Sequence, residues 1–143
     1  MMAHRRWLPI AALLVFVAPA ASGQGSALTP AQAGAFMGTW VIDMTEPAAF
    51  KGTHTVRIWD NNGVVAASLQ TGEFPPHNVT GIVKDGNMLV LTISHEAQPA
   101  MLENGAPIWA VISLTLEGDT MRVAQMLERS QTIKRGTGKR QAD

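Results

Sequence analysis

Apolar and polar residues alternate along most of the chain from residue 38 onward. The alternation has a period of two and its apolar positions are rich in Val, Ile and Leu, which is the pattern of half-buried β-strands. It predicts seven strands, with an eighth at 130–134. The seven are 38–44, 53–60, 64–70, 78–84, 88–96, 108–117 and 120–128.

Short turn sequences separate these strands. Asn62-Gly63, Asp85-Gly86 and Gly118-Asp119 suit two-residue hairpin loops, because such loops need positive φ and select Asn, Asp and Gly. The loops fix the register of each hairpin. The expected pairs are Val56–Leu69 and Ile58–Ala67 in the first hairpin, Ile82–Leu89 and Val83–Met88 in the second, and Leu114–Val123 and Ile112–Gln125 in the third.

Tight hairpins without a long helical pattern between them predict an antiparallel up-and-down meander. An open meander would leave two exposed edges, so we expect an all-β fold that closes into a small 7- to 8-stranded barrel. Such a barrel holds packed side chains or one small ligand. The alternative is a two-sheet sandwich, which usually needs longer crossing connections.

The first 23 residues have the pattern of an export signal. A basic start over 4–6 precedes an apolar run over 8–17, and small residues over 18–23 offer a cleavage site. The apolar run is shorter than the roughly 20 residues of a membrane-spanning helix. We therefore expect a signal peptide over 1–23, a periplasmic or secreted protein, and no membrane span.

Composition narrows the class of protein. The chain has eleven Lys and Arg, eleven Asp and Glu and no cysteine, which excludes disulfides, thiolate zinc sites and cysteine nucleophiles. The charge balance also argues against a nucleic-acid partner. Five of the basic residues fall in 129–143, which we expect to be a last strand followed by a solvated, partly disordered tail. The expected layout is a lead-in over 24–37, a barrel over 38–128 and this end.

The start of the first predicted strand resembles a known family. Gly38-Thr39-Trp40 follows a short lead-in in which Thr29 and Pro30 favour a helical turn. This resembles the calycin group, the lipocalins and their bacterial lipocalin-like relatives, in which a Gly-x-Trp closes one end of the barrel. The resemblance implies that Trp40 packs under Arg129 or Arg135, and that the protein binds a small, mostly hydrophobic molecule.

Size, export signal and the Gly-x-Trp start are also similar to those of lipocalin-like bacterial inhibitors of secreted metalloproteases. Those inhibitors insert an exposed N-terminal segment into the protease cleft. The analogous stretch here is 26–29. This second resemblance implies a protein partner, and an interaction module is the alternative to ligand binding.

Inward-facing polar residues mark the predicted ligand site. His54 shares the strand parity of Val56 and Ile58, and Gln125 faces Ile112, so polar groups would stand on an apolar inner face and orient a ligand. The alternative is that such residues are solvated at the barrel rim. The predicted ligand contacts are His54, Val56, Ile58, Leu69, Phe74, His95, Ile112 and Gln125.

Catalytic and metal-binding motifs are missing from the sequence. The histidines lack metal-motif spacing, and there is neither a nucleophile elbow nor a phosphate-binding glycine loop. The carboxylates fall mostly at turns and strand ends, as solvated charges do. We expect binding without chemical conversion, with no catalytic residue, no metal and no cofactor. A small enzyme that uses His54 or His95 is the third alternative.

Overall fold

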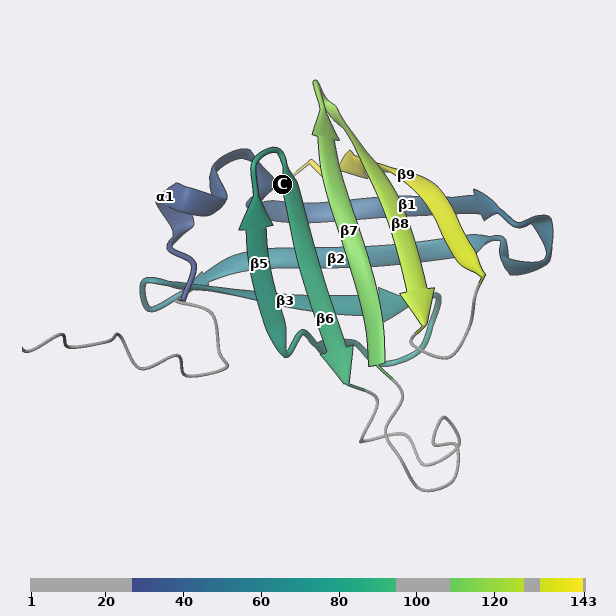
Figure 1. Ribbon diagram of the computed structural model, residues 1–143, viewed down its shortest axis with the longest axis horizontal. Coiled ribbons are helices and arrows are strands. Elements are labelled where there is room, and N and C mark those ends of the chain that lie inside the picture. The colour runs from purple at the N-terminus through teal and green to yellow at the C-terminus, as the bar shows by residue number, and fades with distance from the viewer. Residues whose placement is uncertain (1–26, 95–108, 128–131, 143) are drawn as a thin grey trace, which may run out of the picture.

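A computed structural model describes residues 27–94, 109–127 and 132–142 (Figure 1). A short helical lead-in precedes a single sheet, which contains nine strands within these residues. The helices are α1 (Pro30–Ala33), η1 (Gly34–Phe36) and η2 (Ala48–Phe50). The strands are β1 (Gly38–Glu46), β2 (Gly52–Asn61), β3 (Val64–Thr71), β4 (His77–Asn78), β5 (Gly81–Asp85), β6 (Met88–Ser94), β7 (Trp109–Glu117), β8 (Thr120–Leu127) and β9 (Ile133–Arg140).

The sheet is an antiparallel meander whose first long strand pairs with its last. Its strand order is β4-β3-β2-β1-β9-β8-β7-β6-β5. In Figure 1 the strands β1 to β3 run across β5 to β8, and β9 curves between the two sets. The fold class predicted from the sequence is confirmed. The sheet curls into a half-barrel, and it contains nine strands where seven or eight were expected.

The two edge strands of the sheet, β4 and β5, form where one predicted strand is interrupted. The segment 78–84 was expected to be continuous, yet β4 and β5 separate at Val79 and Thr80. The Val79 amide donates to the Ala67 carbonyl on β3 at 2.9 Å, and the Thr80 amide donates to the Thr92 carbonyl on β6 at 2.8 Å. The chain therefore passes here from one half of the sheet to the other, and pairing with two different strands prevents a single strand.

Two of the three predicted hairpin registers are confirmed. Val56 pairs with Leu69 and Ile112 with Gln125, as expected. The second register is wrong, because Asp85 pairs with Met88 and the loop is therefore Gly86-Asn87. Gly86 has φ of 58° and Gly118 has φ of 60°, so in both loops glycine takes the first position. A two-residue loop that starts with positive φ favours glycine there, which moves the turn one residue onward.

The last strand was expected at 130–134, but it extends to residue 140 and includes most of the segment expected to be a solvated tail. Residues 133–140 pair with β8 on one side and β1 on the other. The inward positions of β9 include Gly136 and Gly138, both buried. A Cβ at Gly136 would overlap the Asp43 carbonyl oxygen and would lie 2.9 Å from Met44 Cα. The apolar alternation that reveals other strands is absent here because β1 leaves no room for side chains.

One end of the half-barrel, the Trp40 end, is closed by a tryptophan and an arginine. Trp40 is 2% exposed, and its indole N–H donates to the Phe36 carbonyl at 2.9 Å. The Arg140 guanidinium lies 4.4 Å from the centre of the indole ring and donates to the carbonyls of Ala35 and Met37. A tryptophan stacked on an arginine was expected, and Arg140 is the partner.

The expectation that Arg135 is the partner of Trp40 was therefore wrong. Arg135 pairs with Glu46 near the opposite end of β1, while Arg140 is the register partner of Trp40. β9 runs to residue 140, further than the sequence suggested, so the later arginine reaches the indole. Arg129 lies outside the described residues. Gly38, the other predicted structural residue, has φ of 118°, a conformation that glycine adopts readily.

The lead-in is held against the sheet. Thr29 caps α1 through a capping box with Gln32, as the Thr-Pro sequence suggested. The Leu28 carbonyl accepts a hydrogen bond from the Val65 amide on β3 at 2.8 Å. No helix among the described residues is long and apolar enough to cross a membrane.

Candidate functional site

The candidate site lies at the far end of the half-barrel, which we define as the end opposite Trp40. β1, β3 and β8 end there, and β2 and β9 begin there. The buried side chains of the described residues are apolar with two exceptions, His54 on β2 and Gln125 on β8. Both exceptions lie toward the far end, as does Lys134 at the start of β9. The polar groups of the inner face are therefore concentrated there.

Gln125 is a buried amide without a hydrogen-bond partner among the described residues. Its side chain is on the inner face of β8, opposite Ile112, and the residue is 9% exposed. Within the described part of the chain no hydrogen bond to this amide is found. A buried polar group without a hydrogen bond costs about 1–3 kcal/mol, and most such groups in native proteins find a protein or water partner. This amide is thus poised to bond something that enters from the far end.

His54 faces inward from the neighbouring half of the sheet. Its Nδ1 lies 3.1 Å from the Thr71 hydroxyl on β3, and the residue is 7% exposed. Burial lowers the pKa of His54 below the ordinary value of 6.5, and the positive charge of Lys134 lowers it further. The imidazole is therefore neutral at neutral pH and serves as a hydrogen-bonding group.

Lys134 also lies at the far end, although it was not among the site residues predicted from the sequence. It pairs with Gln125 across β8 and β9 and is half-buried. Its ammonium lies 4.5 Å from the centre of the Phe50 ring. It is the last residue of the predicted eighth strand, and its strand parity, shared with Gly136 and Gly138, is the signal that places it on the inner face.

The predicted apolar contacts face inward, as their parity indicated. Val56, Ile58, Leu69 and Ile112 are between 0% and 3% exposed. Side chains at this exposure leave no space for water beside them, so they pack against one another as a core. Phe74, in the turn after β3, is 66% exposed. His95 lies outside the described residues. Ligand contact by these residues stays a prediction.

Metal-ligating side chains form no cluster at the far end within the residues that the structure describes. In residues 27–94, 109–127 and 132–142, no group of three or more His, Asp or Glu side chains is placed to hold a metal ion. The hydrogen-bond partner of His54 is a hydroxyl and not a carboxylate. The described geometry offers hydrogen bonds and one positive charge beside an apolar core.

Lowering the pH is expected to destabilise the protein through His54. Because its folded pKa is depressed, the unfolded chain binds a proton more readily, so the free energy of unfolding falls as the pH drops below about 6.5 toward the folded pKa. Urea unfolding at several pH values between 7.5 and 5 measures this. His54→Gln should reduce the dependence of the free energy of unfolding on pH between the folded and unfolded pKa of His54. Lys134→Gln should narrow this pH range, because the positive charge of Lys134 lowers the folded pKa. A wild-type curve unchanged by His54→Gln would contradict the assignment.

The fold and the far end together define a small all-β half-barrel with a polar group of residues at one end. No family model matches the chain, and no curated protein matches it. Among solved structures, a secretary abundant heat soluble (SAHS) protein from Ramazzottius varieornatus matches with 11% sequence identity and a TM-score of 0.41, covering 74% of this chain and 95% of that one.

Proposed function

We propose that the protein binds a small, mostly hydrophobic ligand at the far end of the half-barrel and does not convert it chemically. The observation that carries the proposal is the Gln125 amide, which is buried beside an apolar core and has no hydrogen-bond partner in the described part of the chain. A ligand with one polar group would bond this amide and approach Lys134, while its apolar body lies against the core and the exposed Phe50 ring. Because the core is tightly packed, we place the ligand at the end of the half-barrel and not in its interior.

Binding of a fluorescent apolar anion tests this proposal. 1-Anilinonaphthalene-8-sulfonate should bind the protein saturably at one site. Gln125→Met should weaken binding about tenfold, because the amide loses its role, while raising the free energy of unfolding of the free protein by about 1 kcal/mol. Lys134→Gln should also weaken binding, and Lys84→Gln, which removes an exposed charge on β5, should not. Unchanged affinity in both far-end variants would overturn the proposal.

Export belongs to the same proposal. It is supported by the basic, apolar and small-residue segments of the first 23 residues, which have the order that signal peptidases require. A protein that acts outside the cytoplasm without cysteine relies on core burial and sheet pairing for its stability. The expected location is the periplasm or the medium.

The alternative of a protease inhibitor has less support. That function needs a free N-terminal segment around 26–29. Leu28 is instead hydrogen-bonded to β3 and packs against the core, and Thr29 caps α1. The enzyme alternative needs a partner that moves protons to or from His54, and its hydrogen-bond partner is the Thr71 hydroxyl.

A further inference from the structure

A groove of about 500 Å³ lies at the Trp40 end, away from the proposed ligand site. None of the residues predicted from the sequence to contact ligand lines it. Its volume falls within the roughly 300–1,000 Å³ of small-molecule sites. The lining residues come from η1, β1, β9 and the β7–β8 hairpin: Ala35, Trp40, Leu116, Gly118, Asp119, Thr120, Lys139 and Arg140.

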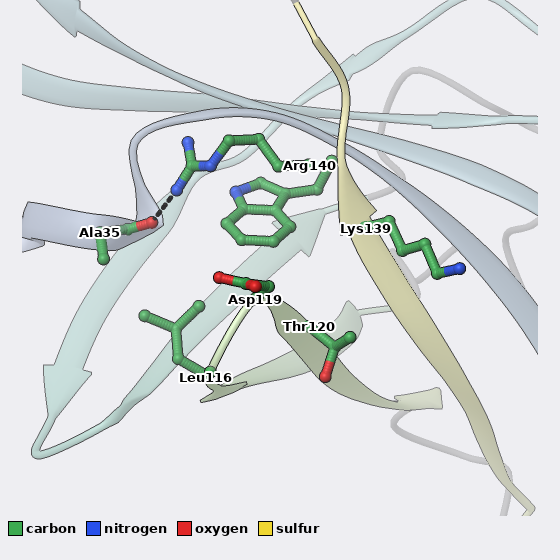
Figure 2. A pocket seen from close by; sticks show the side chains of 8 residues that line it. Ala35, Leu116, Asp119, Thr120, Lys139 and Arg140 are labelled. Carbon is green, nitrogen blue, oxygen red and sulfur yellow. Dashed lines mark hydrogen bonds between the residues drawn. The ribbon is translucent and has the colours of Figure 1, made fainter.

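One side of the groove is cationic. Arg140 is fixed by its contact with Trp40 and by hydrogen bonds to the carbonyls of Ala35 and Met37, the first of which is drawn in Figure 2. Both acceptors are uncharged carbonyl groups. Within the described residues no carboxylate forms an ion pair with the guanidinium, and its remaining N–H donors have no partner. Lys139 also lines the groove, but its side chain extends away from Arg140 and Asp119 (Figure 2).

The other side of the groove carries an acid. In the view of Figure 2, Asp119 and Leu116 lie across the groove from Ala35 and Arg140. Asp119 occupies the second position of the two-residue loop between β7 and β8, and the Thr120 hydroxyl closes this turn by donating to the Glu117 carbonyl at 3.0 Å. The carboxylate is therefore presented from a short, braced turn. In the described part of the chain it forms no ion pair.

From this arrangement we infer that the groove binds a small zwitterion with an apolar body, of the class of free α-amino acids with apolar side chains. The ligand carboxylate meets Arg140, and the ligand ammonium meets Asp119. The apolar side chain lies against Leu116 and Trp40. A ligand with a single charge would satisfy only one side of the groove and leave the opposite charge facing its apolar body, so the pair of charges determines the class.

Three related probes measure separately how the ligand ammonium and the ligand carboxylate contribute to binding. L-Leucine carries both, N-acetyl-L-leucine lacks the ammonium, and L-leucinamide lacks the carboxylate. In titrations followed by amide NMR shifts, leucine should move the signals of 116–120 and 139–140 saturably, and each singly charged probe should bind about tenfold more weakly. No saturable shift of these signals up to about 20 mM leucine, or equal affinity for all three probes, would overturn the inference.

Single variants assign each charge. Asp119→Asn keeps a residue that suits the turn and should weaken leucine binding about tenfold while leaving N-acetyl-leucine unaffected. Arg140→Gln should weaken the binding of leucine and N-acetyl-leucine and spare leucinamide, whose unchanged binding shows that the groove remains folded. The charge-matched controls are Asp43→Asn and Lys84→Gln, both exposed and outside the groove. Leucine binding that Asp119→Asn does not weaken would contradict the inference, whatever the far end binds.

Discussion

Replacing Trp40 by alanine should lower the free energy of unfolding by about 3–5 kcal/mol, the range for truncating a large buried aromatic side chain. The substitution removes a 2% exposed ring, the hydrogen bond from the indole to Phe36 and the surface on which Arg140 stacks. The carbonyl of Phe36 would also lose its donor. Chemical denaturation followed by circular dichroism measures the loss.

Trp59→Ala is the matched control. Trp59 lies on the outer face of β2, where it is half-buried beneath Arg57, whose guanidinium is 5.1 Å from the ring centre. Its truncation should cost about 1 kcal/mol, since the ring is partly solvated and its cation–π contact is weak at an exposed site. Equal losses for the two tryptophans would show that Trp40 does not close the barrel end.

Gly136→Ala should destabilise the protein by about 3 kcal/mol or more, the upper part of the range for overpacked cores. The new Cβ would meet the backbone of β1, at the Asp43 carbonyl and at Met44 Cα. Backbone atoms cannot rotate aside as a side chain does, so β1 and β9 must separate. These strands join the first and last parts of the meander, and the loss should appear in thermal and urea unfolding.

Gly52→Ala provides the comparison for this substitution. Gly52 is exposed at the start of β2, and a Cβ there would find nothing within 4 Å. Its replacement should change stability by less than about 1 kcal/mol, because only the entropy of the unfolded chain differs. If both alanine variants behave alike, the close approach of β1 to β9 is not a feature of the folded protein.

Strands with one apolar and one polar face could be predicted from the sequence. A strand whose inner face is shaped by close packing against its neighbours could not. The β2–β3 and β7–β8 hairpins follow from alternation and from loop residues that accept positive φ. β9 was only partly anticipated because its inner face is made of Gly136 and Gly138, whose role is to leave room for neighbouring strands. The position of such a strand is determined by its pairing with segments distant in the sequence, which a local pattern of residues does not show.

Some residues of the candidate site could likewise be predicted from the sequence and others could not. Parity placed His54 and Gln125 on the inner face, and both are buried. Lys134 was expected in the eighth strand at 130–134, but its parity was not used to place it on the inner face, because a cluster of basic residues usually indicates a solvated surface. The arginine that stacks on Trp40 was assigned to the wrong position because it depends on where β9 ends, which is set by pairing with β1.

The Trp40 groove had no signal in the sequence. Its charged residues, Asp119, Lys139 and Arg140, come from a hairpin loop and from the last strand, about twenty positions apart. Asp119 was interpreted as a turn residue, and the two cations as part of a tail. Only the pairing of β8 with β9 brings the loop to the end of the last strand.

Native mass spectrometry of the protein isolated from its own host tests the central claim most directly. Ligand binding at the far end predicts a population whose mass exceeds that of the chain by one small molecule, and Gln125→Met should deplete that population. The same spectrum gives the mass of the exported chain, which should begin shortly after residue 20 or 23. A chain that carries no small molecule, or one that carries a second protein in its place, would contradict the account.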